Sequence, residues 1–229
     1  MPASETVKTK ERISKAAPVR VRARGLRVRY APSTLLTLPD LTLRSGQELA
    51  LVGPSGSGKT TLLHVLAGLL KPTQGTVEVA GETLTELPQL RLERFRAKHI
   101  GLIFQDLHLI DGYTALENVV VALAAAGVPL GEANKRARVL LGDLGLSHRL
   151  SHLPKRLSTG ERQRVAIARA TAANPVVLLA DEPTANLDRA RGEVALALLR
   201  EVARRSDAAL VVSTHDPAVR ETFAEVIEL

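Results

Sequence analysis

A glycine-rich segment at residues 53–60, GPSGSGKT, fits the pattern G-x-x-x-x-G-K-[ST]. Glycines at this spacing let successive backbone N–H groups turn inward and form a cradle for an anion. Lys59 can reach the outer phosphates of a nucleotide, and the hydroxyl of Thr60 can bind Mg²⁺. Because an apolar strand is expected just before the segment and a helix just after it, we predict phosphate binding at a helix N-terminus. The predicted phosphate-binding residues are Gly53, Pro54, Ser55, Gly56, Ser57, Gly58, Lys59, Thr60 and Thr61.

Two adjacent carboxylates, Asp181 and Glu182, follow the apolar residues 176–180 (VVLLA). A buried strand would bring Asp181 to the Mg²⁺ ion and its water shell. Glu182 would then be free to face the γ-phosphate and polarise a water molecule. Phosphoryl transfer depends mainly on charge neutralisation and a positioned water. The two motifs together predict hydrolysis of a nucleoside triphosphate.

Three further positions are weak signals by themselves. Ser158 precedes a helical pattern and is followed three residues later by Glu161, which is the pattern of a capping box. Gln105 ends an apolar strand expected at 99–105, and His215 follows the apolar residues 209–213. A histidine or glutamine at a strand end is usually structural. The order of all these positions along the chain is what makes them informative.

This ordered set resembles the ATP-binding subunits of ABC transporters, and the resemblance covers residues 19–229. It implies that residues 157–161 (LSTGE) are the signature sequence and that Glu182 is the catalytic glutamate. It further implies that Gln105 senses the γ-phosphate and helps to bind Mg²⁺, and that His215 holds the γ-phosphate. The other ATP contacts that the resemblance implies are made by Tyr30, Ser158, Thr159, Gly160, Glu161 and Asp188.

The resemblance also implies a mechanism with ATP and Mg²⁺ as cofactors. Two copies of the chain would form a homodimer around two ATP molecules, each held by the phosphate loop of one copy and the signature of the other. Ser158 and the N–H group of Gly160 would complete the γ-phosphate cradle from the opposite copy. Hydrolysis would reopen the dimer and drive an integral membrane permease through the helical insert next to Gln105. Nucleic acid is not an expected partner.

Thr159 departs from the family pattern, which has glycine at this position of the signature. A β-branched side chain there would be strained if the position required a positive φ. Dimer closure or turnover would then be weakened, although Ser158 and Gly160 remain. Glu161 replaces the glutamine of the family pattern, which is a change that the family is expected to tolerate.

Residues 104–119 and 164–170 resemble the lipoprotein-release and macrolide-export class of this family. That resemblance implies extrusion of a lipoprotein, a peptide or a drug. Two other functions stay open: a cell-division ABC ATPase that regulates wall hydrolases without transport, and a soluble ABC ATPase. The soluble class is disfavoured because the chain has one cassette, no cysteine and only 99 residues from Lys59 to Ser158. Importer subunits share the catalytic motifs, so these residues do not give the direction of transport.

The expected fold is α/β: a P-loop NTPase core with a mainly parallel sheet, an antiparallel edge sheet at its N-terminal end and an α-helical subdomain inserted at about 106–173. The pattern slips by one residue at Gly25, which predicts a turn or bulge in an edge strand. Strands are expected at 19–30, 36–43, 48–53, 75–81, 99–105, 176–180, 209–213 and 226–229. Helices are expected at 58–70 and 189–204, with three more in the insert.

The chain has 229 residues, a net charge of +7 and no cysteine, which excludes disulfide scaffolds and cysteine-ligated metal sites. Residues 1–30 carry nine Lys and Arg against two Asp and Glu, so they account for the whole net charge. We expect residues 1–18 to be a flexible arm that is either simply solvated or attracted to anionic lipid. The longest uncharged apolar run, 119–130, is too short to span a bilayer. Without an apolar leader, the chain is expected at the cytoplasmic face of the membrane, held there by its permease.

Overall fold

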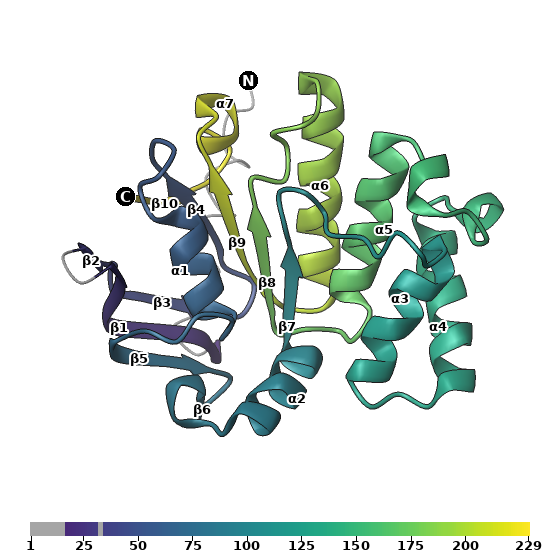
Figure 1. Cartoon of the computed structure of the whole chain (residues 1–229). Helices are drawn as coiled ribbons and strands as arrows, with labels where there is room; N and C mark the ends of the chain where they lie inside the picture. The colour runs from purple at the N-terminus through teal and green to yellow at the C-terminus, as the bar shows by residue number, and fades with distance from the viewer. Residues whose placement is uncertain (1–16, 32–33) are drawn as a thin grey trace, which may run out of the picture.

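Two β-sheets and a group of helices make up the part of the chain that the computed structural model describes, residues 17–31 and 34–229 (Figure 1). All but the last two positions of the expected N-terminal arm lie outside the described residues. Among the described residues, no helix combines the length and the apolar character needed to cross a bilayer. The α/β fold class is confirmed.

The central sheet is parallel throughout, with the strand order β10-β4-β9-β8-β7. Every residue of β8 and β9 is buried, as expected for strands covered on both faces. One face packs against α1, and the other packs against α6 and α7 and against Ile167 of α5. The elements of this layer are β4 (Glu48–Val52), α1 (Lys59–Leu66), β7 (Ile100–Ile103), β8 (Val177–Asp181), α6 (Arg189–Arg205), β9 (Ala209–Thr214), α7 (Pro217–Arg220) and β10 (Glu225–Glu228).

The second sheet is antiparallel and is built around β1 (Val19–Ala31). β1 pairs with three strands, so the prediction that it is an edge strand was wrong. The predicted bulge is present, because Gly25 has φ +59° and the register with β5 shifts beside it. The other strands are β2 (Thr34–Thr37), β3 (Leu41–Arg44), β5 (Gln74–Val79) and β6 (Glu82–Thr83), followed by a 3₁₀ turn (Leu84–Glu86).

The single strand predicted at 36–43 is instead two strands, β2 and β3, separated by residues 38–40. Pro39 has no N–H group to give to a ladder, which favours an interruption there. The interrupted segment is fixed by other bonds. Leu38 N donates to Leu26 O, and the Asp40 carboxylate accepts a hydrogen bond of 2.7 Å from Gly25 N at the bulge.

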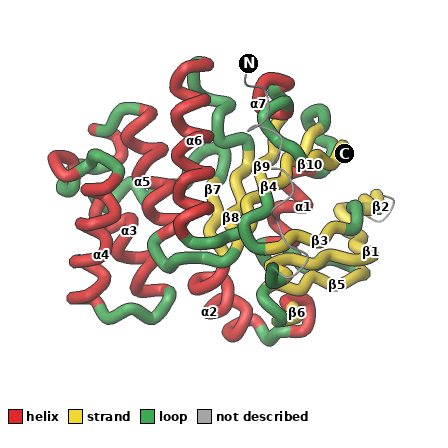
Figure 2. Tube along the Cα trace, turned by 180° about the vertical axis from the view of Figure 1, so that it is seen from behind, coloured by secondary structure: helices red, strands yellow, loops and turns green. Residues whose placement is uncertain are grey.

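Three helices between β7 and β8 form a separate layer beside the parallel sheet (Figure 2). They are α3 (Ala115–Ala125), α4 (Leu130–Asp143) and α5 (Thr159–Thr171), with two 3₁₀ turns (Ser147–Arg149 and Pro154–Arg156) before α5. α5 belongs to two hydrophobic cores, because Val165 and Ala168 pack with α3 and α4 while Ile167 packs with the central sheet. It therefore joins the helical layer to the sheet.

One helix, α2 (Gln89–His99), was not predicted from the sequence. None of its residues is fully buried, and only Leu92 and Phe95 pack against the core, so the apolar pattern in this charged segment is weak. It lies beneath β7, at the lower end of the sheet in Figure 1.

The carboxyl ends of β4, β9 and β8 lie side by side because their registers are aligned. Val52 is opposite Thr214, and Asp181 is opposite Ser213. The segments that follow these three strands therefore meet at one edge of the sheet, the usual place for a ligand in an open α/β sheet.

Close packing between β7 and α5 depends on Gly101. A Cβ atom at this position would lie 2.4 Å from the carbonyl oxygen of Ala170 and 2.9 Å from Leu178 Cδ1. A real side chain never approaches backbone so closely, so the strand and the helix would have to separate.

We predict that Gly101→Ala lowers the free energy of unfolding by about 1–3 kcal/mol through overpacking. The matched control is Gly131→Ala in α4, where an added Cβ would meet no atom within 4 Å. Urea unfolding should show a lower midpoint for the first variant and an unchanged or higher midpoint for the second. Equal midpoints for the two variants would contradict the packing argument.

Candidate nucleotide-binding site

The loop at residues 53–58 connects β4 to α1 and has room for little besides backbone. A Cβ on Gly53 would lie 2.5 Å from the carbonyl oxygen of Leu229 and 2.7 Å from Ser57 Oγ. Gly56 and Gly58 have φ values of +81° and +106°, which only glycine adopts without strain. No side chain caps the N-terminus of α1, so the N–H groups of its first turn are available to an anion.

Lys59, the first residue of α1, is buried with only 6% of its surface exposed. Its ammonium group donates to the carbonyl oxygens of Gly53 at 2.8 Å and Pro54 at 3.0 Å. Nζ also lies 3.6 Å from Glu182 Oε1, which is itself buried. The lysine is thus held inside the loop by oxygen atoms that a bound phosphate would replace or join.

Glu182 follows β8 and is fixed on several sides. Its backbone has φ +45°, and its N–H group donates to Ser213 Oγ at 2.9 Å. Glu182 Oε2 lies 2.9 Å from His215 Nδ1, which acts as the donor because a carboxylate only accepts. Ser213 Oγ in turn donates to Asp181 Oδ1 at 2.5 Å, so one serine orients both acidic residues.

A cavity of about 690 Å³ lies over the loop, and the structure brings most of the predicted residues to it. Gln105, Glu182 and His215 reach it from three different segments. Its lining consists of Leu36, Pro54, Ser55, Gly56, Gly58, Lys59, Thr60, Thr61, Gln105, Glu182 and His215. These residues are up to 179 positions apart in the sequence, and they meet because Leu36 of β2 in the second sheet lies against the edge of the parallel sheet where the others gather.

The predicted signature residues do not reach this cavity in the same copy of the chain. Ser158 and Gly160 line a groove between α5 and α6. Asp188 is the N-cap of α6, where it accepts a hydrogen bond of 3.0 Å from the N–H group of Arg191. The side chain of Tyr30 lies outside the part of the chain that the structure describes.

The residues present fit ATP and Mg²⁺. Ser57 Oγ is buried and has no hydrogen-bond partner among the described residues, as expected of a hydroxyl in a phosphate cradle. No group of three His, Cys, Asp or Glu in the described part of the chain could hold a metal alone. Mg²⁺ commonly binds one or two protein ligands together with phosphate oxygens and waters, which suits Thr60 and Asp181.

The N-terminus of α5 has a complete capping box. Ser158 N donates to Glu161 Oε2 at 2.7 Å, and Glu161 N donates to Ser158 Oγ at 3.3 Å. Arg149 Nε donates to Glu161 Oε1 at 2.7 Å and neutralises the carboxylate. The hydrogen bond from the Ser158 backbone, followed by the bond from Arg149, lowers the pKa of Glu161 to about 2. The helix end therefore keeps its positive dipole despite the adjacent acid.

Thr159 is the first residue of α5 and does not have a positive φ, so the backbone strain considered for this position does not arise. Its hydroxyl accepts a hydrogen bond of 3.2 Å from Arg162. The next residue, Gly160, is open: an added Cβ would meet only Arg164 Nη1, at 3.9 Å. Nothing in the described part of one copy requires glycine at position 160.

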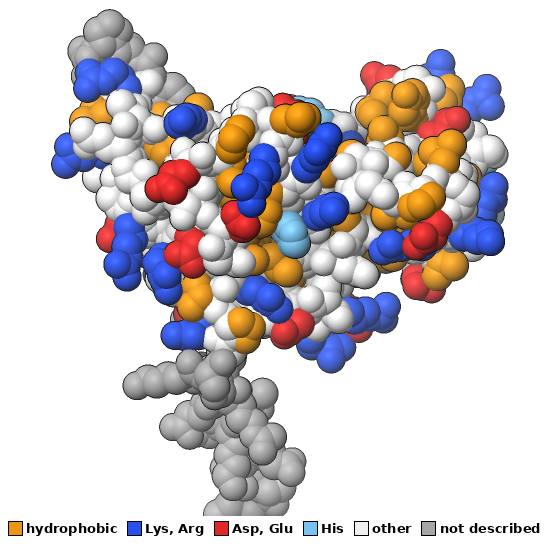
Figure 3. Space-filling model, turned by 90° about the horizontal axis from the view of Figure 1, so that it is seen from below, with side chains coloured by type: hydrophobic (Ala, Val, Ile, Leu, Met, Phe, Trp, Pro, Cys, Tyr) orange, Lys and Arg blue, Asp and Glu red, His pale blue; other side chains and the backbone are white. Residues whose placement is uncertain are grey.

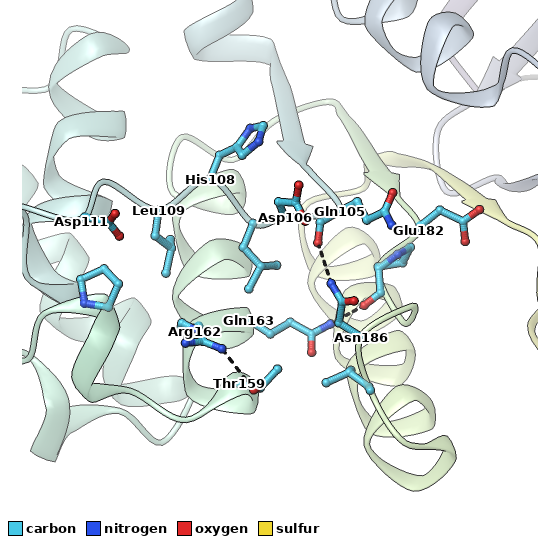
Figure 4. A pocket seen from close by; sticks show the side chains of 14 residues that line it. Gln105, Asp106, His108, Leu109, Asp111, Thr159, Arg162, Gln163, Glu182 and Asn186 are labelled. Carbon is cyan, nitrogen blue, oxygen red and sulfur yellow. Dashed lines mark hydrogen bonds between the residues drawn. The ribbon is translucent and has the colours of Figure 1, made fainter. Parts of the chain in front are cut away.

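A second cavity, of about 530 Å³, lies between the start of α5 and the segments that follow β7 and β8. Figure 4 shows Thr159 and Gln163 on one side of it, with Gln105, Glu182 and Asn186 on the other. Sequence reasoning missed Gln163 and Asn186, and it also missed Leu36, Ser213 and Arg149. Only Ser213 had a usable signal, because it lies two residues before His215 at the end of a predicted strand.

Comparison with known proteins is decisive here. The family model described as "ABC transporter" matches residues 36–185. The chain belongs to the ABC transporter family. It is 48% identical over 183 residues to the lipoprotein-releasing system ATP-binding protein LolD of Shewanella sp. (strain MR-4), covering 80% of this chain and 79% of that protein. It is 42% identical over 213 residues to LolD of Xylella fastidiosa (strain Temecula1), covering 91% and 89%.

Solved structures of ATP-binding cassettes are also similar to this chain. The dimeric ATP-binding cassette MJ0796, in a post-hydrolysis state bound to ADP and Pi, has a TM-score of 0.80 and 35% sequence identity, with 91% of this chain and 94% of that one covered. This ABC protein is thus an ATPase that uses ATP and Mg²⁺, as predicted. The roles of the individual residues remain predictions.

The lowered pKa of Glu161 predicts a pH-dependent contribution to stability. A carboxylate whose pKa is about 2 when folded and 4.5 when unfolded stabilises the fold fully above pH 4.5, and this contribution disappears as the pH falls towards 2. Glu161→Gln should therefore unfold at lower urea concentration than wild type at pH 7, and the difference should shrink between pH 5 and pH 3. A difference that stays constant over this range would contradict the assignment.

Proposed function

We propose that this ABC protein is the ATP-hydrolysing subunit of a lipoprotein-releasing transporter. Its domain would span residues 19–229, with the helical subdomain at 106–173. It would work as a homodimer bound to the cytoplasmic face of the inner membrane through an integral permease. The observation that carries the proposal is the meeting of Lys59, Glu182 and His215 at one cavity. The names of its relatives support lipoprotein release as the kind of transport.

The bound nucleotide supplies the reacting phosphate, with Mg²⁺ to neutralise its charge. Lys59 would donate to phosphate oxygens in place of the carbonyl oxygens that it contacts now. Glu182 would accept a hydrogen bond from the attacking water and so orient it. His215 already donates to the Glu182 carboxylate and would hold it in the orientation needed. Gln105 would contact the γ-phosphate side from the end of β7.

The position of the signature supports the homodimer. Ser158 and Gly160 do not line the phosphate cavity of their own copy, but they begin a helix of 13 residues. In the first turn, the N–H groups of Thr159 and Gly160 have no acceptor within the helix. Such an end binds phosphate well, so the partner copy's ATP is the suitable ligand. The structural relative MJ0796 is described as dimeric.

A groove of about 510 Å³ between α2, β7 and the helical subdomain is the proposed docking site of the permease. It is lined by Leu90, Arg94 and Ala97 of α2 and by Phe104, which precedes Gln105. An occupant would therefore contact the residue next to the γ-phosphate sensor. The lower face of the molecule, where α2 lies, shows Lys and Arg side chains beside hydrophobic ones (Figure 3).

The alternatives are less well supported. The relatives reported above are lipoprotein-releasing proteins, which favours neither a cell-division ATPase nor a soluble one. The two alternatives and the transporter share the same ATP chemistry, so they are distinguished by their partner.

Glu182→Gln should bind ATP, accumulate as a closed dimer and lose at least about 100-fold in kcat, since the group that positions the water is neutralised. Size-exclusion chromatography with MgATP and a phosphate-release assay check this. Turnover at the wild-type rate would show that Glu182 is not the catalytic residue.

When Glu182→Gln is isolated from native membranes with MgATP, a multi-spanning protein should copurify. Recovery of only soluble proteins would overturn the transporter proposal.

Lys59→Ala should lose nucleotide binding, because it removes the one Lys or Arg among the described residues that line the loop cavity, while the glycines stay. A fluorescent ATP analogue should bind at least about tenfold more weakly, an effect of 1.4 kcal/mol or more. Lys71→Ala, at an exposed lysine outside the cavity lining, is the matched control and should bind as wild type. Equal affinity of the Lys59 variant and wild type would contradict the phosphate-loop assignment.

A further inference from the structure

Helix α5 contacts both segments that would face its own copy's γ-phosphate, through two side chains to which neither the motifs nor the proposed function assigns a role. Gln163 contacts the segment after β8, and Arg169 contacts the segment after β7. The inference drawn from these contacts rests on the proposed function, since it concerns the same hydrolysis reaction.

Gln163 binds the segment that contains the catalytic glutamate. Its side chain is 4% exposed, and Nε2 donates to the carbonyl oxygen of Pro183 at 2.7 Å. Pro183 follows Glu182, whose φ of +45° is unfavourable for a residue with a side chain. Such a conformation persists only where its surroundings impose it. Gln163 on one side and Ser213 on the other provide that constraint.

Arg169 binds the segment that follows Gln105. Its guanidinium donates to the carbonyl oxygens of Leu107 at 2.6 Å and His108 at 2.5 Å. Both residues have positive φ, +60° and +44°. Arg169 has no carboxylate partner among the described residues, and burial alone lowers its pKa. Because the partly buried guanidinium donates to two backbone carbonyls, it stabilises the otherwise unfavourable conformation of Leu107 and His108.

These two contacts are the side-chain hydrogen bonds that connect α5 to the two segments in the described part of the chain. Elsewhere the start of α5 and the segments are separated by the cavity of about 530 Å³ shown in Figure 4. The middle of α5 is fully buried at residues 165–168, and close packing of this kind transmits a displacement along the helix. A displacement at its N-terminus therefore reaches Glu182 and Gln105 through these contacts.

We propose that Gln163 and Arg169 are positioning residues that make hydrolysis in one copy depend on the signature contact with the partner copy's ATP. Engagement of Ser158 moves α5. Gln163 then places the Glu182 segment, and Arg169 places the Gln105 segment. Both residues act on kcat and on the cooperativity between the two ATP sites, and neither contacts the nucleotide.

The test uses the full chain with Gln163→Met, which keeps side-chain length and removes the donor, and Arg169→Met, which keeps an unbranched apolar side chain and removes the guanidinium. The matched control is Thr171→Val, which removes a buried hydrogen bond of 2.8 Å that stays within α5, from Thr171 Oγ1 to the Ile167 carbonyl. ATPase rates against ATP concentration give kcat and the Hill coefficient. Binding of a fluorescent ATP analogue and the urea midpoint are measured for each variant.

We expect kcat to fall about 10- to 100-fold in both Met variants, because small misplacements of catalytic groups cost rates of this order. Their Hill coefficient should fall to 1, while the affinity for the ATP analogue stays within twofold of wild type. Arg169→Lys, which can serve one carbonyl, should recover part of the rate. Thr171→Val should keep the wild-type kcat and Hill coefficient at a similarly lowered urea midpoint.

Two outcomes would overturn the inference. The Met variants could match wild type in kcat and Hill coefficient, or Thr171→Val could lose as much as they do, which would make the effect one of helix stability. In either case an inactive Glu182→Gln leaves the proposed function in place. Wild-type turnover by Glu182→Gln would instead contradict the catalytic assignment itself.

Discussion

A lysine ammonium buried at the edge of a parallel sheet needs oxygen atoms as hydrogen-bond or ion-pair partners. The arrangement of the central sheet brings these oxygen atoms to it. The carbonyl oxygens of Gly53 and Pro54 and the carboxylate of Glu182 surround Lys59. They meet because β4, β8 and β9 run parallel in aligned register, so that the segments after them share one edge. The two hydrophobic cores on either side of the sheet keep that register. An ATPase site follows directly, since the same cation attracts phosphate.

The helical layer adds a second constraint. α5 packs into the helical core through Val165 and Ala168 and into the sheet core through Ile167. It therefore connects the helical layer to the sheet, and a movement of either one acts on it. Its N-terminal residues Ser158 and Gly160 lie outside the phosphate-loop cavity of their own copy. A cavity separates the start of α5 from the segments after β7 and β8. Gln163 and Arg169 are the side chains of α5 that bridge to these segments.

Type and spacing were enough to select residues that line one cavity in the structure, while the roles of these residues stay predictions. Lys59, Glu182, His215 and Gln105 belong to a motif or end an apolar strand, and the fold class followed from the alternation of strands and helices. What could not be predicted consists of contacts to backbone. Gln163 reaches a carbonyl 20 residues away, which leaves no pattern in residue types. α2 was missed because only Leu92 and Phe95 of this charged segment pack against the core. The strand predicted at 36–43 was wrong because apolar alternation occurs on both sides of Pro39, although its phase slips by one residue there.

Gly160 has a consequence for how variants of this protein are selected. A side chain at this position meets almost nothing within one copy, and in a helix it would even favour folding. Under the proposed function, any requirement for glycine there arises in the dimer around nucleotide. Screens that reward abundance or thermal tolerance of the purified chain would then accept substitutions at position 160 that abolish ATP hydrolysis. Substitutions at this position would therefore affect the assembly of the two copies without lowering the stability of one copy, so folding assays would not detect them.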